Sequence, residues 1–265
     1  MRLDGKVAVV TGGGRGIGKA IAVAFAAEGA SVVVASRNME NLKKTVTEIE
    51  SKGGKALAIQ TDVTIEEQVE RMVRQAVDAF GKIDILVNNS GIGGVTCPVV
   101  DLKLEDWLEV INVDLTGSML CTKHALKYMI PQGSGVIINI AAEGGRAGDG
   151  RAGYPMRSPY CCAKMGLIGL TETVAVEVGK YGIRVNAISP AAVRGERLEN
   201  VVKARAQAMG VPYEELMAKI AENYSLGRIV EEREVAAVAV FLASDEASAI
   251  TGQTIPVHCG HHVNF

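Results

Sequence analysis

Short runs of β-branched and other apolar residues alternate along the chain with longer stretches in which apolar residues recur every three or four positions. The short runs predict strands, and the longer stretches predict helices. Strands are expected at 6–12, 31–36, 56–62, 83–91, 135–141, 182–190 and 252–257. Helices are expected between these runs, with the last at 232–244. Alternation of this kind is typical of parallel strands covered on both faces. It therefore predicts an α/β fold with a doubly wound parallel sheet of about seven strands.

Capping residues and helix breakers refine the expected helix ends. Thr64 and Glu67 have the spacing of a capping box. Ser158 followed by Pro159 favours a helix start. After the sixth strand, residues 210–212 (Gly-Val-Pro) are expected to break a helical stretch into two.

The composition fits one globular unit. The chain has 265 residues, of which 48% are hydrophobic, and neither a linker nor a shift in composition divides it. We therefore expect one domain over 1–265, with a substrate-loop segment at about 191–228. The formal net charge of −2 gives no reason to expect nucleic acid or an acidic membrane as a partner. No apolar run approaches the roughly 20 residues of a membrane span, and no signal peptide is expected.

A glycine-rich segment, TGGGRGIG, joins the first expected strand to the first expected helix. Gly12 permits a tight turn, Gly16 lets the backbone approach a pyrophosphate, and Gly18 lets the helix pack closely on the strand. The helix would then present free N–H groups and the positive end of its dipole to phosphates. Because the glycines lie between a strand and a helix, they indicate a Rossmann-type dinucleotide site.

Together with motifs elsewhere, this loop makes the chain resemble the short-chain dehydrogenase/reductase family over essentially its whole length. The similarity is to the single-domain branch, which includes 3-oxoacyl-carrier-protein reductases. The motifs that carry it are Thr11-Gly12…Gly16-Ile17-Gly18, Asp62-Val63, Asn88-Asn89-Ser90-Gly91, Asn112, Tyr160…Lys164 and RVNAISP at 184–190.

The resemblance implies an NAD(P)-dependent oxidoreductase that interconverts a secondary alcohol and a ketone. It also implies a homotetramer and a cytoplasmic location. The residues expected to contact the cofactor are Gly12, Gly14, Arg15, Gly16, Ile17, Gly18, Ser36, Arg37, Asp62, Val63, Asn89, Gly91, Tyr160, Lys164, Pro190 and Val193.

The end of the second strand bears on the choice of nicotinamide cofactor. An acid there would bind the adenosine ribose diol and repel a 2′-phosphate. The chain instead has Ser36 and Arg37, with Arg15 inside the glycine loop. Two guanidinium groups and no carboxylate suit a phosphate. We therefore expect NADP(H) to be favoured, with NAD(H) as the alternative.

Tyr160 and Lys164 lie four residues apart and so share one face of the expected helix. A tyrosine hydroxyl, with an ordinary pKa of about 10, is a poor base at neutral pH, and a lysine ammonium nearby favours the phenolate. Tyr160 could then exchange a proton with a substrate oxygen while hydride moves at the adjacent carbon. The resemblance assigns these roles and adds a contact between Lys164 and the nicotinamide ribose. It also makes Asn112 the asparagine that holds a water in the proton relay.

The family's catalytic serine, which donates a hydrogen bond to the substrate oxygen, corresponds to Ala142 in this chain. Loss of one such donor typically costs about 10²–10³ in rate. Three explanations stay open: the alanine was introduced to trap a complex, a natural enzyme recruits another donor, or the chain is an impaired partner subunit of an active dehydrogenase. The candidate replacement donors are Ser158, protonated Glu143, Ser90 and a water. The following loop is lengthened by a five-residue echo, GRAGD and then GRAGY, at 145–154.

Basic residues near the expected pocket suggest a substrate class. Arg151 and Arg157 precede Tyr160, and Arg194 follows the sixth strand. In this fold both segments border the crevice where ligands bind. We therefore expect Arg151, Arg157, Arg194 and Glu143 to face an anionic substrate, which could be a carboxylate, a sulfonate or an acyl thioester on a phosphorylated carrier. The alternative is that these are solvated side chains that pair with one another. No metal is expected, because the C-terminal histidines lack the spacing of a zinc site.

Overall fold

The computed structural model describes residues 1–143 and 154–261, and at its centre lies a seven-stranded sheet. The strands are β1 (Val7–Thr11), β2 (Ser31–Ser36), β3 (Lys55–Gln60), β4 (Ile85–Asn88), β5 (Gly135–Ile140), β6 (Ile183–Pro190) and β9 (Thr254–Val257). Their order is β3-β2-β1-β4-β5-β6-β9, and every neighbouring pair is parallel. The strand order reverses between β1 and β4, which is where such folds bind ligands. The predicted doubly wound sheet is confirmed.

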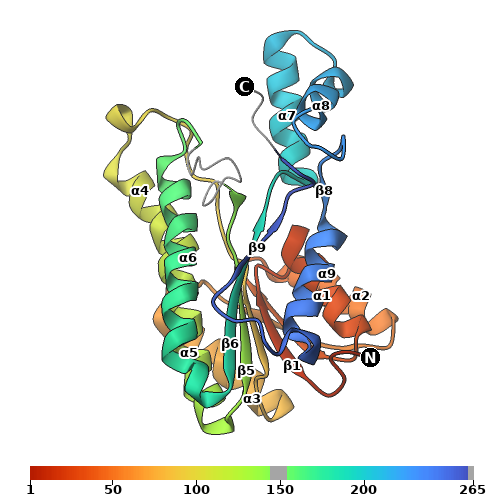
Figure 1. Ribbon diagram of the computed structural model, residues 1–265, viewed down its shortest axis with the longest axis vertical. Coiled ribbons are helices and arrows are strands. Elements are labelled where there is room, and N and C mark those ends of the chain that lie inside the picture. Colours follow the sequence, from red (N-terminus) through yellow and green to blue (C-terminus); the bar gives the residue numbers. More distant parts are fainter. Residues whose placement is uncertain (144–153, 262–265) are drawn as a thin grey trace.

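Helices lie on both faces of the sheet (Figure 1). On one side are α1 (Gly16–Ala27), α2 (Met39–Ser51) and α9 (Glu232–Ala243); on the other are α3 (Glu66–Phe80), α4 (Leu104–Ile111), α5 (Gly117–Gln132) and α6 (Ser158–Val178). Short helical turns are η1 (Val99–Asp101), η4 (Gly179–Tyr181) and η5 (Asp245–Ala247). Neighbouring residues of β1 pack into two different hydrophobic cores, one on each face of the sheet. Val10 lies in the core that contains Phe25, and Val9 in the core that contains Met72. Burial on both faces explains the unbroken apolar runs of these strands.

A smaller unit projects beyond the carboxyl ends of the strands (Figure 1). It contains β7 (Val193–Arg194), α7 (Glu196–Met209), α8 (Tyr213–Ala221) and β8 (Val230–Glu231), and β7 pairs with β8. The predicted break between the two helices is confirmed. Gly210 has a φ of +66°, and Pro212 directly precedes α8.

Two predicted helix caps are wrong. Thr64 donates its hydroxyl to Asp62 Oδ1 at 2.7 Å instead, and α3 begins at Glu66 without a side-chain cap. Ser158 is already the first residue of α6, so its hydroxyl lies too far along the helix to cap it. That hydroxyl is buried and has no hydrogen-bond partner among the residues described.

A five-residue π-helical turn, η2 (Asn112–Thr116), joins α4 to α5 without a break in the helical rod. Such turns hold an extra residue relative to an α-helix and are frequent at functional sites. The extra residue changes which side chains face the sheet. Asp114 becomes fully buried, whereas Asn112 is exposed.

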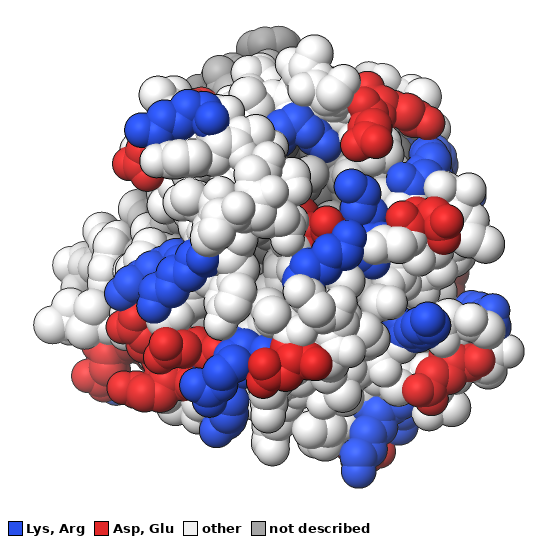
Figure 2. All heavy atoms as spheres, turned by 90° about the horizontal axis from the view of Figure 1, so that it is seen from below, with Lys and Arg blue, Asp and Glu red and all other residues white. Residues whose placement is uncertain are grey.

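The distribution of surface charge and the length of the helices bear on whether nucleic acid or a membrane is a partner. Figure 2 shows the face at the amino ends of the strands, where lysine and arginine side chains are interspersed with aspartate and glutamate. The described helices include none that is both long enough and apolar enough to cross a membrane.

Candidate active site

The glycine-rich loop lies between β1 and α1 at the carboxyl edge of the sheet. Gly12 and Gly16 have φ angles of +66° and +58°, a region that favours glycine. A Cβ at Gly18 would collide with the side-chain amide of Asn89 and with the Gly12 carbonyl. At Gly16 the nearest described atom to such a Cβ is Glu232 Oε1, at 3.8 Å. Neighbouring atoms therefore fill the space beside Gly12 and Gly18, whereas the space beside Gly16 is open.

Thr11 ties this loop to the end of β4. Its hydroxyl accepts hydrogen bonds from the backbone N–H groups of Asn89 and Ser90, at 3.0 and 3.1 Å, and donates to the Val87 carbonyl at 3.3 Å. The Asn89 amide in turn donates to the carbonyls of Thr11 and Gly12, at 2.9 and 3.3 Å. These bonds fix the two loops that flank the switch point of the sheet.

A cavity of about 360 Å³ lies beside the ends of β2 and β3. Its lining residues are Arg37, Gln60, Asp62, Ile65, Gln68 and Arg71. Arg37 follows β2 and Arg71 comes from α3, so the cavity is lined by two guanidinium groups. The cavity also contains one acid, Asp62, whose carboxylate accepts from both the N–H and the hydroxyl of Thr64. Sequence reasoning missed Arg71, because it lies mid-helix and belongs to no motif.

These residues fit a nicotinamide dinucleotide. The first-turn N–H groups of α1 have no acceptor within the helix, and the open space above Gly16 admits a pyrophosphate. One feature opposes an anion at this place. The Glu232 carboxylate lies beside Gly16, and burial raises its pKa above the ordinary value.

Tyr160 and Lys164 come together on α6. The Lys164 ammonium lies 5.7 Å from the centre of the Tyr160 ring. Lys164 is buried, and its Nζ donates to the Ile140 carbonyl at 3.0 Å. The end of β5 therefore holds the ammonium beside the tyrosine.

Asp114, rather than Asn112, reaches Lys164. Asp114 Oδ2 lies 3.3 Å from Lys164 Nζ, and Oδ1 accepts from the Ile92 N–H at 2.7 Å. A Cβ at Gly91 would be only 3.0 Å from Oδ2, so glycine there makes room for the carboxylate. The prediction for Asn112 is corrected, because the π turn directs its side chain away from the site. No spacing rule in the sequence could separate these two residues.

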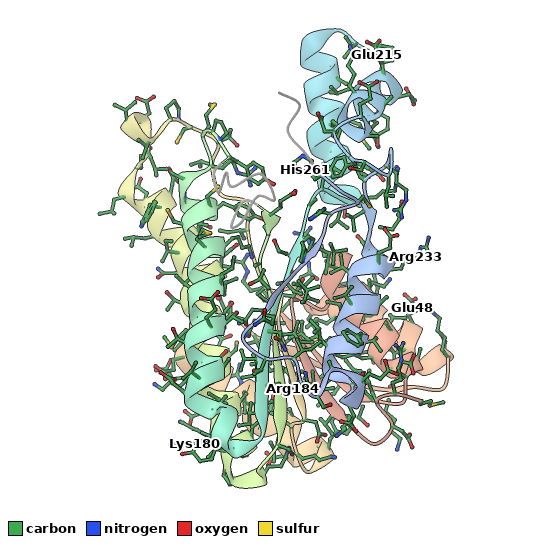
Figure 3. All side chains as sticks on the ribbon, in the orientation of Figure 1. Glu48, Lys180, Arg184, Glu215, Arg233 and His261 are labelled. Atoms are coloured by element: carbon green, nitrogen blue, oxygen red, sulfur yellow. The ribbon has the colours of Figure 1, made fainter. Side chains whose placement is uncertain are left out.

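A buried carboxylate follows Ala142, the alanine expected at the position of the family's serine. Ala142 is 7% exposed and Glu143 is 3% exposed, so the alternative of a solvated Glu143 does not hold. Glu143 Oε1 lies 2.9 Å from His261 Nδ1, and neither carboxylate oxygen accepts a hydrogen bond from a described residue. The His261 ring packs on Tyr224 with ring centres 4.6 Å apart. Figure 3 labels His261 at the end of the sheet where the smaller unit begins.

Two further tyrosines lie close to Glu143. Burial raises the pKa of both Tyr154 and Tyr224, and the negative charge of Glu143 raises each further. The charges of Tyr160 and Tyr224 also raise the pKa of Tyr154, so these groups lie within electrostatic range of one another. The Tyr224 hydroxyl accepts from the Ala192 N–H at 3.3 Å, next to the segment that follows β6.

The predicted arginines have different surroundings. The Arg157 guanidinium lies over the Tyr160 ring, 5.0 Å from its centre, and its buried Nε has no partner among the described residues. Arg194 instead donates to Glu231 Oε1 at 2.9 Å. Arg151 lies outside the described residues, as does the GRAGD and GRAGY echo up to residue 153.

The remaining predicted residues lie along the same edge of the sheet. Pro190 ends β6, and Val193 pairs with Val230 between the two short strands. Val63 is buried against Gly117 at the start of α5. No cluster of three or more His, Cys, Asp or Glu side chains suited to a metal ion occurs within 1–143 and 154–261.

Comparison with known proteins identifies the family to which the chain is similar. The family model described as enoyl-(acyl carrier protein) reductase matches residues 12–262. Among curated proteins, meso-2,3-butanediol dehydrogenase of Serratia marcescens is 38% identical over 260 residues, covering 98% of this chain and 96% of the relative.

Solved structures agree with these sequence matches. The NAD⁺-bound xylitol dehydrogenase superposes with a TM-score of 0.90 at 34% identity, covering 98% of this chain and all of the other. Actinorhodin polyketide ketoreductase with NADPH gives 0.89 at 35% identity, covering 96% of each chain. Agreement in sequence and in fold over nearly the whole chain shows that this protein belongs to the short-chain dehydrogenase/reductase family of nicotinamide-dependent oxidoreductases.

Proposed function

We propose that the protein is an active NAD(P)-dependent enzyme that interconverts a secondary alcohol and a ketone. The observation that carries this proposal is the placement of Tyr160 beside the buried Lys164 ammonium, at the same edge of the sheet as the open glycine loop. When bound, the nicotinamide ring supplies or accepts a hydride.

The chain's own residues move the proton. In alcohol oxidation, the Tyr160 phenolate takes the proton of the substrate hydroxyl as the adjacent carbon loses its hydride. Lys164 and Arg157 place positive charge near the phenol, 5.7 and 5.0 Å from its ring centre. Asp114 offsets part of the Lys164 charge and holds that ammonium in place.

Ala142 supplies no hydrogen bond to the substrate oxygen, so the reaction is expected to be slow. Ala142→Ser should raise kcat by about 10²–10³, because it restores one donor to the developing negative charge. The measurement is the change in cofactor absorbance with a panel of secondary alcohols and ketones.

Ala141→Ser is the matched control, since it adds the same hydroxyl to the adjacent buried residue. It should leave kcat near that of the unmodified chain. If neither the unmodified chain nor Ala142→Ser turns over any substrate while cofactor still binds, the impaired partner subunit becomes the better description.

The cofactor preferred by this site is NADP(H). Arg37 and Arg71 line the cavity beside β2, where no acid follows the strand, and Arg15 precedes α1. Replacing Arg37 with aspartate should reverse the preference, because a carboxylate repels a 2′-phosphate and accepts from a ribose diol. Dissociation constants for NADPH and NADH, measured by fluorescence, test this. Tighter NADH binding by the unmodified chain would contradict it.

An anionic substrate group, such as a carboxylate or an acyl thioester on a phosphorylated carrier, is a second expectation that only Arg157 supports. Its unpartnered Nε lies near Tyr160, whereas Arg194 is paired with Glu231. Arg157→Gln should raise the KM of charged alcohols more than that of neutral ones. An equal change in KM for charged and neutral alcohols would contradict an anionic substrate group.

The functional unit is a homotetramer, as the family resemblance implies. A groove of about 420 Å³ between α5 and α6 supports this, because its lining is largely apolar. The lining residues are Leu115, Thr116, Met119, Gly166, Gly169, Leu170 and Thr173. Met165 and Val176 on the same helix are also exposed, 42% and 85% respectively.

A further inference from the structure

The pair formed by Glu143 and His261 has no part in the proton transfer assigned to Tyr160 and Lys164. Glu143 follows β5, and His261 arrives from the C-terminal segment through an antiparallel bridge to Tyr224. The His261 N–H is fixed in turn by the His258 carbonyl, at 2.9 Å. Two segments more than a hundred residues apart in sequence therefore converge on one buried carboxylate, which directly follows Ala142 at the end of β5.

The Glu143 carboxylate lacks part of its expected hydrogen bonding. His261 Nδ1 lies 2.9 Å from Oε1, but both carboxylate oxygens are buried and neither accepts a hydrogen bond from any described residue. A buried polar group without a partner costs about 1–3 kcal/mol, and more when it is charged. A ligand that brings a donor to Oε2 would recover this energy.

The chemistry of the carboxylate restricts what that ligand group can be. An ionised carboxylate only accepts hydrogen bonds, so it cannot pair with the oxygen of a reacting ketone. It repels an anion. Among uncharged donors, a hydroxyl is the group that an alcohol or ketone substrate of the proposed reaction can carry on a neighbouring carbon.

We propose that Glu143, oriented by His261, binds a second hydroxyl group on the carbon next to the reacting carbon. The substrates would then be vicinal diols and α-hydroxy ketones rather than simple alcohols and ketones. This inference rests on the proposed oxidoreductase function and adds the substrate class. His261 is a positioning residue, since it reaches the substrate through Glu143.

The test compares matched substrates with the full-length chain and saturating cofactor. The pairs are 2,3-butanediol with 2-butanol, and acetoin with 2-butanone. The unmodified chain should show at least a 10-fold higher kcat/KM for the hydroxylated member of each pair. In Glu143→Ala this ratio should fall by about 10- to 100-fold, the range expected for one hydrogen bond to a charged group. His261→Ala should lower it in the same direction but by less.

Glu222→Ala, an exposed glutamate beyond α8, is the matched control and should leave the ratio unchanged. Glu143→Gln retains an oxygen acceptor without the charge, and its ratio should lie between the other two. Cofactor affinity, measured for each variant, shows that it has folded.

Three results would overturn the inference: equal kcat/KM for both members of a pair, an unchanged ratio in Glu143→Ala, or a preference for 3-amino-2-butanol over the diol. The last would indicate a cation site instead. If no alcohol or ketone reacts at all, the proposed function fails. Calorimetric binding of diol against mono-alcohol to the cofactor-loaded protein then decides the hydroxyl site separately, and equal affinities would overturn it.

Discussion

Asp114 and Lys164 together determine the net charge beside Tyr160. Both are buried, 0% and 5% exposed, so solvent screens their 3.3 Å contact only weakly. A carboxylate at this place offsets the ammonium, which an uncharged amide would not do. Asp114 therefore bears directly on the net charge beside Tyr160.

Asp114→Asn should lower kcat/KM for alcohol oxidation by about 10-fold, because the amide no longer forms the buried ion pair that holds the Lys164 ammonium beside Tyr160. Steady-state rates with a secondary alcohol measure this.

Asn112→Ala serves as the comparison, because Asn112 is exposed on the same turn. Its kcat/KM should match that of the unmodified chain. A loss of activity in Asn112→Ala but not in Asp114→Asn would restore the role first expected for the asparagine.

The sequence predicted the placement of those site residues whose position depends only on the local chain geometry. Tyr160 and Lys164 share a helix face because they are four residues apart, and the glycine loop follows from its place between a strand and a helix. Asp114 was missed because a π turn alters the helical register. His261 was considered only as one of the C-terminal histidines that lack the spacing of a zinc site. Its contact with Glu143 depends on the path of the C-terminal segment, which no short pattern encodes.

At the scale of elements, the first turns of α1 and α9 meet at the dinucleotide loop. Glu232, the first residue of α9, places a carboxylate beside Gly16 and also close to Gly195, the residue before α7. An anion bound at the start of α1 would lie near this negative charge. The start of α9 therefore weakens the anion site that the glycine-rich loop forms.

Glu232→Gln should tighten cofactor binding about 3- to 10-fold at pH 7, a modest effect because the carboxylate is partly solvated. Burial raises the pKa of Glu232, so its negative charge is lost at a higher pH than for an ordinary glutamate. As pH falls towards that raised pKa, the affinities of the two proteins should converge. Titration of NADPH fluorescence between pH 5 and 8 measures both effects.

Glu177→Gln provides the control, since this exposed residue lies near the far end of α6. It removes the same charge from the whole molecule and should leave the dissociation constant unchanged. An equal gain in both variants would mean that net charge, rather than the position of Glu232, is responsible.

The strands and most helices could be predicted because the pattern of apolar residues reflects burial on two faces of a sheet. Helix ends were harder to place. Thr64 and Ser158 are good capping residues by type, but Thr64 binds Asp62 and Ser158 lies one position too far along its helix. Hydrogen bonds to neighbouring side chains compete with caps, and the sequence does not show which one wins.

At the scale of the whole molecule, α5 and α6 present an apolar groove on the outside of the fold. Gly169 lines it, is exposed, and has no atom within 4 Å of where a Cβ would lie. A side chain there meets nothing within the chain itself. In the proposed tetramer, it would meet a second copy packed on the same groove.

Gly169→Glu should therefore lower the molar mass in solution from that of a tetramer towards a smaller species. Light scattering after size-exclusion chromatography measures this. Glutamate in place of glycine should add up to about 0.5–1 kcal/mol of helix stability, so misfolding is not the expected cause.

Gly179→Glu is the matched control, because Gly179 is also exposed and free of contacts but lies beyond the end of α6. Its molar mass should equal that of the unmodified chain. A tetramer that persisted in Gly169→Glu would place the interface elsewhere.

The π turn between α4 and α5 also determines which kinds of sequence change this chain tolerates. Loss of Asn112 or Val113 would return this stretch to α-helical geometry, because the π turn holds one residue more than an α-helical turn. The remaining side chains of the turn would then take new directions, so the contact between Asp114 and Lys164 would be lost although both residues were still encoded. In this stretch a change of length is more damaging than a change of residue, so relatives are best aligned by keeping its five positions intact.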